Sequence, residues 1–194
     1  MGDVRPTCRA RGRSGHFPFA EVAGIMAILS VSLSPMPPRT HHRIATHRSS
    51  IHGRGVFAVS ALHAGETIIE YKGKRLTHAQ ADDLYGDGGE GGHTFLFTLN
   101  ARYIIDANQQ GNSARWINHS CAPNCQALVV ESASGDARRD RVVIEALRDI
   151  RPGEELTYDY GITLDVPHTA RLKKIWACRC GAPQCTGTLL KARR

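Results

Sequence analysis

Short apolar stretches separated by turn-forming residues run through the chain from residue 44 onward. Six of these stretches are enriched in β-branched and aromatic side chains, which is typical of strands. They cover residues 55–59, 67–71, 94–98, 103–105, 126–130 and 141–145. Because many short strands at close spacing are characteristic of β architecture, and no internal repeat is visible, we expect a mainly β fold.

Only two segments favour helices. Residues 77–85 begin with Thr77, a good N-cap, and the glycine-rich residues 86–92 that follow are expected to end the helix as a flexible loop. A second short helix is expected over residues 168–175. The fold should therefore contain few helices, and both should be short.

The N-terminal part of the chain has a different pattern. Residues 1–15 are rich in Arg, Gly and Ser without apolar periodicity, so they are expected to be disordered. Residues 22–33 form an apolar run of twelve residues. Because a bilayer span needs ~20 residues, no membrane association is expected.

The same part of the chain has the outline of a signal peptide, with arginines before the apolar run and prolines after it. Glu21 at the edge of the run and Pro35 after the candidate cleavage site weaken that interpretation. An alternative is that translation starts at Met36 and that the preceding residues are a mis-assigned extension. The expected divisions of the chain are an N-terminal extension (1–42), a central domain (43–165) and a C-terminal segment (166–194).

Composition is that of a globular protein, with 41% hydrophobic and 22% charged residues. The net charge of +7 is uneven, because residues 1–48 carry seven arginines and only two acidic residues. Such a basic arm can contact nucleic acid weakly through counterion release. A solvated tail is the simpler interpretation.

Six cysteines are present, and their spacing does not suggest a disulfide framework. Three of them form the run Cys178-x-Cys180-x4-Cys185, which is typical of zinc ligands. Zinc binds thiolates, so the site implies a reducing compartment such as the cytosol or nucleus. Three thiolates leave a tetrahedral zinc ion one ligand short.

Two further motifs precede that cysteine run. Residues 111–125 read Gly-Asn-Ser-Ala-Arg-Trp-Ile-Asn-His-Ser-Cys-Ala-Pro-Asn-Cys, and residues 155–160 read Glu-Leu-Thr-Tyr-Asp-Tyr. In this order the three motifs resemble those of the SET-domain lysine methyltransferases, and the resemblance covers roughly residues 43–190. It implies small curved β-sheets with few short helices, a C-terminal segment threaded under a preceding loop like a pseudoknot, and a zinc-bound post-SET tail. The compact architecture resembles that of bacterial members.

The resemblance implies S-adenosylmethionine as the cofactor. Residues 52–55 look like the family's first cofactor loop, in which glycines let the main chain approach the ligand. Asn118 and its neighbouring amides suit the ammonium and carboxylate groups of the methionine moiety. The implied cofactor contacts are His52, Gly53, Arg54, Gly55, Phe95, Asn118, His119 and Tyr160.

The same resemblance implies the catalytic residues. Tyr160 matches the family's essential tyrosine, and Tyr158 matches the neighbouring position that is tyrosine or phenylalanine in different members. Tyr71 and Phe95 are expected to wall the channel for the substrate lysine. Outside this context, two tyrosines two positions apart would be explained by same-face packing on a strand, and Phe95 by simple core alternation. Trp116 departs from the family pattern by replacing the usual phenylalanine.

The family completes its zinc site with the cysteine directly after Asn-His-Ser, which is Cys121 here. Cys125 is the competing candidate, although it matches a position that the family leaves unligated. The implied zinc ligands are Cys121, Cys178, Cys180 and Cys185. Cys8 and Cys125 are then expected to be free thiols.

We therefore expect an S-adenosylmethionine-dependent protein-lysine N-methyltransferase that acts as a monomer, mainly by monomethylation. Its substrate should be an exposed lysine on a histone or histone-like basic protein. The expected location is the cytoplasm or, alternatively, a host nucleus reached as a secreted effector. Two other functions remain open: a catalytically weak SET module that serves as a protein- or chromatin-binding scaffold, and a small zinc-ribbon nucleic-acid binder that accounts only for the cysteine run.

Overall fold

The computed structural model describes residues 7–8, 43–86, 95–164 and 166–191. Most of the N-terminal extension lies outside these residues, including the apolar run, Met36 and most of the basic arm that was expected to contact nucleic acid. The predicted loop at 87–92 also lies outside them. Two residues of the extension, Thr7–Cys8, form the short strand β1, which the composition did not predict.

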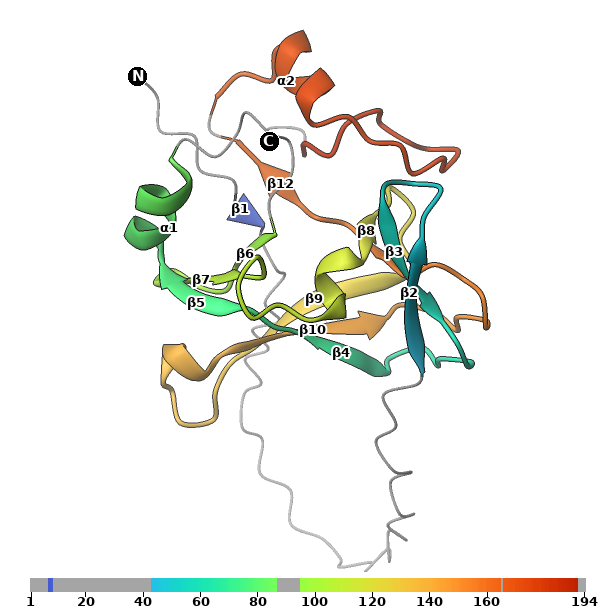
Figure 1. Ribbon diagram of the computed structural model, residues 1–194, viewed down its shortest axis with the longest axis horizontal. Coiled ribbons are helices and arrows are strands. Elements are labelled where there is room, and N and C mark those ends of the chain that lie inside the picture. The colour runs from blue at the N-terminus through green and yellow to red at the C-terminus, as the bar shows by residue number, and fades with distance from the viewer. Residues whose placement is uncertain (1–6, 9–42, 87–94, 165, 192–194) are drawn as a thin grey trace, which may run out of the picture.

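Small sheets make up most of the described fold (Figure 1). The largest are two three-stranded antiparallel sheets, ordered β4-β10-β9 and β5-β7-β6. Their strands are β4 (Thr67–Tyr71), β10 (Arg141–Ala146), β9 (Cys125–Val130), β5 (Lys74–Thr77), β7 (Tyr103–Asp106) and β6 (Leu96–Thr98). Two-stranded sheets join β2 (Ile44–Arg48) to β3 (Arg54–Ala58), β8 (Asn118–His119) to β11 (Thr157–Tyr158), and β1 to β12 (Ile162–Thr163). The expectation of a mainly β fold with few short helices is confirmed.

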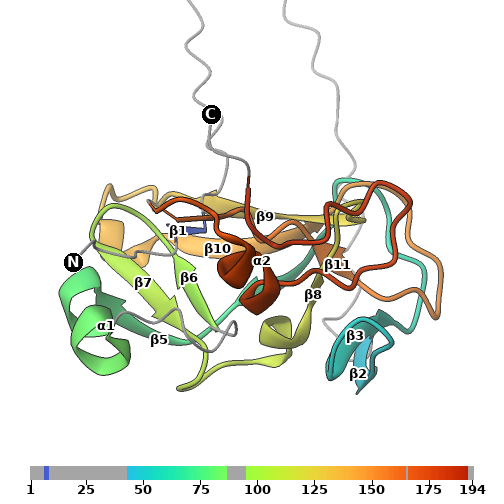
Figure 2. The same cartoon turned by 90° about the horizontal axis from the view of Figure 1, so that it is seen from above.

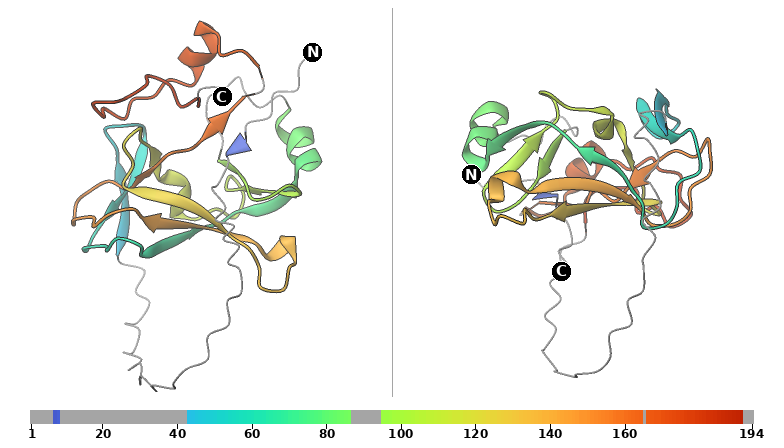
Figure 3. Two further views of the ribbon diagram at one scale, coloured as in Figure 1. Left: turned by 180° about the vertical axis from the view of Figure 1, so that it is seen from behind. Right: turned by 90° about the horizontal axis from the view of Figure 1, so that it is seen from below.

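All six predicted strands are present, as β3, β4, β6, β7, β9 and β10, with ends shifted by one or two residues. The short strands β2, β5, β8, β11 and β12 were not predicted. Most of them have only two to four residues, so their pairing comes from distant segments and leaves little local pattern. The connection between β9 and β10, which contains the 3-10 turn η2 (Ala137–Arg139), projects from one end of its sheet (Figure 3).

Helix α1 (His78–Tyr85) begins where the sequence predicted. The Thr77 hydroxyl accepts a hydrogen bond from the main-chain amide of Gln80, and the Gln80 side chain accepts one from the main-chain amide of Thr77. These two hydrogen bonds form a capping box. The helix ends at Gly86, whose φ of 58° suits glycine. Helix α2 (Ala170–Ile175) starts after Thr169 and is shorter than expected. Within the described residues, neither helix has the length and apolar character of a membrane span.

Three clusters of buried side chains hold the described fold together. The largest packs the β3, β4, β7 and β10 side chains with the segment around Ile117. A second joins side chains of the C-terminal segment, including Ile162 and Trp176, and a third joins Leu76, Ala81 and Ile104 where α1 packs on β5 and β7. Tyr160 packs against the first two clusters, so it lies at the junction between the central domain and the C-terminal segment.

Strands β8 and β11 bring two motifs together that lie far apart in the sequence. They pair in parallel, with Asn118 opposite Thr157 and His119 opposite Tyr158. The C-terminal loops that follow α2 lie over the end of the molecule that holds β8 (Figures 1 and 2). Three segments therefore converge at this end of the fold.

Candidate active site and metal centre

A cavity of about 560 Å³ lies where these segments meet. Every residue predicted to contact the cofactor or to line the lysine channel borders it, with the exception of Gly55. These residues are His52, Gly53, Arg54, Tyr71, Phe95, Asn118, His119, Tyr158 and Tyr160. The fold therefore gathers one continuous site from five separate parts of the chain.

Gly55 instead packs behind the cavity wall. A Cβ atom added at Gly55 would overlap the carboxylate of Glu155, so only glycine leaves room for that side chain. Gly53, by contrast, borders the cavity with a φ of 49°, in the left-handed region that favours glycine. The two glycines of the loop thus serve different purposes.

Glu155 is a positioning residue to which the sequence reasoning assigned no role. Its Oε1 accepts a hydrogen bond from Asn118 Nδ2 at 2.8 Å, and its Oε2 accepts one from the Ser49 hydroxyl at 2.9 Å. Asn124 Nδ2 also donates to its main-chain oxygen. The signal in the sequence was its place at the start of the Glu-Leu-Thr-Tyr-Asp-Tyr run, but nothing there revealed its partners.

Asn118 ties the cofactor loop to this carboxylate. The Nδ2 group lies 2.9 Å from the Arg54 main-chain oxygen and 3.3 Å from that of His52. Because the amide nitrogen is used within the protein, its role is to hold residues 52–54 in place. The remaining polar atom of this side chain, Oδ1, is the acceptor that can serve a ligand.

His119 is buried and neutral. Its Nδ1 accepts a hydrogen bond from the Tyr160 amide at 3.1 Å, which leaves the ring proton on Nε2, 3.6 Å from the Cys121 sulfur. Burial lowers the pKa of His119 below its ordinary value, although the nearby Asp159 carboxylate opposes this. The imidazole therefore fixes the main chain of Tyr160 without adding positive charge to the site.

Aromatic rings form one wall of the cavity. Tyr158 and Tyr160 lie 4.9 Å apart between ring centroids, and Tyr71 donates its hydroxyl proton to the Phe95 main-chain oxygen. Phe97 packs between the Tyr71 and Tyr158 rings, 5.4 and 6.5 Å away, as the buried member of its strand. Tyr160 donates its hydroxyl proton to the Ile117 main-chain oxygen at 2.9 Å.

Several lining residues were not predicted from the sequence. The most prominent are Arg115 and the C-terminal residues Lys174, Trp176 and Arg179. Arg54, Arg115, Lys174 and Arg179 make the cavity wall cationic. No carboxylate of a described residue borders the cavity. Trp176 is buried, and its indole Nε1 has no hydrogen-bond partner among the described residues.

Four sulfur atoms meet beside the cavity. Those of Cys121, Cys178, Cys180 and Cys185 all lie within 4.8 Å of one another. The Cys121 sulfur lies 3.8 Å from that of Cys178 and 4.0 Å from that of Cys185. A zinc–sulfur bond of ~2.3 Å in a tetrahedron implies sulfur atoms roughly 3.8 Å apart, so this cluster fits zinc.

Main-chain amides donate hydrogen bonds to two of these sulfurs. Cys121 N–H donates to the Cys180 sulfur and Gly187 N–H to the Cys185 sulfur, both at 3.4 Å. Although burial opposes it, such hydrogen bonds lower the pKa of the Cys180 thiol to about 6. Cys125 lies apart in β9, fully buried, where burial raises the pKa of its thiol to about 12.

Comparison with known proteins agrees with this geometry. The family model of the SET domain matches residues 53–161. A Saccharomyces cerevisiae protein described as "Histone-lysine N-methyltransferase, H3 lysine-4 specific" is 41% identical over 145 residues, which is 73% of this chain and 13% of the yeast protein. Human "Histone-lysine N-methyltransferase 2B" is 36% identical over 160 residues, 78% of this chain and 6% of the human protein.

A plant relative gives the same result. "Histone-lysine N-methyltransferase ATX2" of Arabidopsis thaliana is 37% identical over 150 residues, 76% of this chain and 13% of the plant protein. The chain therefore matches only a small part of each of these much longer relatives.

Proposed function

The chain belongs to the SET-domain family, and from that premise we propose that it is an S-adenosylmethionine-dependent protein-lysine N-methyltransferase. The observation that carries the proposal is the single cavity that joins the cofactor loop, Asn118, His119 and the two tyrosines at the edge of the four-sulfur cluster. None of these segments could form the site alone.

The cavity suits a ligand with the chemistry of this cofactor. It has the volume of a nucleoside-sized pocket and a mainly apolar lining with a few polar atoms. Asn118 Oδ1 is available to accept from an ammonium group, and Lys174 and Arg179 in the cavity wall can bind a carboxylate.

S-adenosylmethionine supplies, when bound, a methyl group that is already activated on a sulfonium. The protein's own residues must deliver a neutral lysine amine to it. An unperturbed lysine has a pKa of ~10.4, so the neutral amine is rare near neutral pH. The aromatic wall removes water from the ammonium form, and the surrounding cations Arg54, Arg115, Lys174 and Arg179 repel it.

Tyr160 is proposed as the main catalytic residue and Tyr158 as its neighbour in the channel. His119 holds the main-chain amide of Tyr160, and the Ile117 main-chain oxygen holds its hydroxyl. The ring of Tyr160 therefore has a defined position at the junction of the two clusters that it packs against. Holding amine and methyl in a near-attack geometry contributes ~7–11 kcal/mol to lowering a barrier. Positioning is therefore the largest contribution that these residues make.

The proposed substrate is a lysine of histone H3 or of a histone-like basic protein. This rests on the names of the relatives, since all three are histone-lysine N-methyltransferases and the yeast protein is specific for lysine 4 of histone H3. Mainly monomethyl product is proposed because Tyr158 places a second hydroxyl in the channel. That the chain is a compact, bacterial-type member of the family stays a prediction.

The test is to incubate the chain with labelled cofactor, histone H3 and whole-cell lysate, and then locate the label by mass spectrometry. Label on lysine is expected. Tyr160→Phe should lower turnover about a hundredfold or more while calorimetry shows unchanged cofactor affinity. A chain that binds no S-adenosylmethionine, or a fully active Tyr160→Phe variant, would contradict the proposal.

A further inference from the structure

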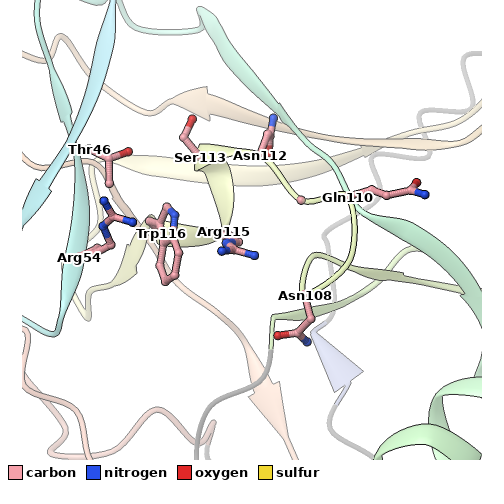
Figure 4. Close-up of a pocket in the computed structure, with 9 residues that line it drawn as sticks. Thr46, Arg54, Asn108, Gln110, Asn112, Ser113, Arg115 and Trp116 are labelled. Atoms are coloured by element: carbon pink, nitrogen blue, oxygen red, sulfur yellow. The ribbon is translucent and has the colours of Figure 1, made fainter.

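A second pocket of about 390 Å³ lies beside the active-site cavity (Figure 4). The two hollows share one wall, because Arg54, Arg115 and Trp116 border both. The rest of its lining is neutral and mostly polar, including Thr46 and Ser113, and no carboxylate of a described residue borders it. We call this hollow the polar pocket.

The two arginines of the polar pocket are held in place by an aromatic ring. Trp116 stands between them (Figure 4), with the Arg115 guanidinium carbon 4.3 Å and that of Arg54 5.4 Å from its ring centroid. Arg115 also donates a hydrogen bond to the Ala107 main-chain oxygen at 2.9 Å. The ion pairs among the described residues include neither guanidinium. Two oriented positive charges therefore stand at the pocket wall without a carboxylate partner among the described residues.

The opposite wall carries backbone strain. Gln110 has a φ of 57°, and it is the one non-glycine residue with positive φ among those described. Next to it, a Cβ atom at Gly111 would overlap the main-chain oxygen of Ala107. Strain of this kind persists where surrounding structure requires it and gathers at ligand sites. The shape of the wall is thus imposed by the fold.

We propose that the polar pocket binds an acidic side chain of a partner protein segment, through its carboxylate, between Arg54 and Arg115. A guanidinium matches a carboxylate in geometry and charge, and Thr46 and Ser113 add hydroxyl groups that can bind neighbouring main chain. The hollow is shallow and open to solvent, which gives a peptide segment access to the two guanidinium groups and to the polar side chains around them. This site goes beyond the proposed methyl transfer, since the occupant is not the methylated lysine.

Because three residues border both hollows, occupancy of the polar pocket should alter cofactor affinity. By linkage, the cofactor must then alter the affinity of the acidic segment by the same factor. A partner that carries this segment would therefore regulate the active site by direct contact with its wall. The effect needs no movement of a domain.

The experiment measures binding of a dye-labelled peptide that contains three consecutive glutamates, by fluorescence anisotropy with the full chain. A matched peptide with glutamines in place of the glutamates should bind about tenfold more weakly, the loss expected for a charge-assisted contact. Thr46→Glu places a carboxylate inside the pocket and should weaken binding of the glutamate peptide by a similar factor. Thr67→Glu, at an exposed strand position outside both hollows, should bind like the unmodified chain.

Equal binding of the two peptides, or unchanged binding by Thr46→Glu, would overturn the proposal. Competition by inorganic phosphate alone with full displacement of the peptide at comparable affinity would assign the site to free anions and overturn the peptide assignment. Ser113→Asp provides a second variant if Thr46→Glu melts at a lower temperature. None of these readouts needs turnover, so failure of the methyltransferase assignment would be seen separately.

Discussion

Glu155 shows how one carboxylate can determine the shape of a binding loop. Its two oxygens hold Asn118 and Ser49, and through Asn118 the main chain of residues 52–54. The negative charge sits behind the loop, where Gly55 leaves space for it. Removing this carboxylate should release the loop while the rest of the cavity stays intact.

We predict that Glu155→Ala weakens S-adenosylmethionine binding about ten- to a hundredfold, since hydrogen bonds to a charged group contribute ~1.5–3 kcal/mol each. Glu155→Gln keeps an oxygen for Asn118 and should lose only a few-fold in affinity. Calorimetric titration of the cofactor checks both, and rescue by glutamine separates positioning from general unfolding. Equal losses in the two variants would argue against the positioning role.

A second prediction concerns Tyr158. Its buried hydroxyl lies in the channel wall, and a hydrogen bond there of roughly 0.5–1.5 kcal/mol would hold the amine or a water molecule against further methylation. Tyr158→Phe should therefore shift products from monomethyl- toward di- and trimethyl-lysine, with little loss in the first step. Mass spectrometry of a methylated peptide provides the measurement. Abundant trimethyl-lysine from the unmodified chain would contradict it.

Short motifs were the part of the site that sequence alone could predict at residue scale. Asn118, His119, Tyr158 and Tyr160 lie within contiguous runs, and all border the cavity. Arg115 also lies within one of these runs, but the orientation of its side chain depends on stacking against Trp116. Trp176 and Lys174 carry no local signal, because they reach the site only through folding of the C-terminal segment.

At the scale of elements, the four-sulfur cluster connects the end of β8 with the loops after α2. Because this cluster fits zinc, purified protein should hold about one zinc ion per chain. The Cys121→Ser variant should lose both the metal and the activity. Cys125→Ser is the matched control and should keep both, since Cys125 is buried in β9 away from the cluster. Metal analysis with hydrogen exchange would show the C-terminal segment loosening first after chelation. Zinc loss in the Cys125 variant would show that the ligand set is wrong.

Element prediction worked where local pattern decides the outcome. Helix α1 follows from its N-cap at Thr77, and the six predicted strands follow from runs of β-branched and aromatic residues. Strands β8 and β11 have two residues each, and they exist because distant segments pair in parallel. Periodicity cannot reveal such pairing, although the motif order allowed the resemblance to imply it.

For the molecule as a whole, the body of the fold begins at Arg43. That side chain pairs with Glu66 and donates to the Ala61 main-chain oxygen at 2.6 Å, which fixes the start of β2. We predict that a chain starting at Met36 melts within a few degrees of the full chain and keeps its turnover. Calorimetry and the labelled-cofactor assay check this. A large loss of either would show that β1, paired with β12, is required.

The four-sulfur cluster also determines when the C-terminal part of the site can assemble during synthesis of the chain. Its first sulfur belongs to Cys121, but the other three come from residues 178–185, near the end of the described chain. Ribosomes release residues from the N-terminus onward at ~5–20 per second, so the central domain emerges seconds before its closing segment. A nascent chain that ends before Cys178 would therefore lack three of the four sulfur atoms and the last part of the cavity wall, which includes Arg179 and Leu189.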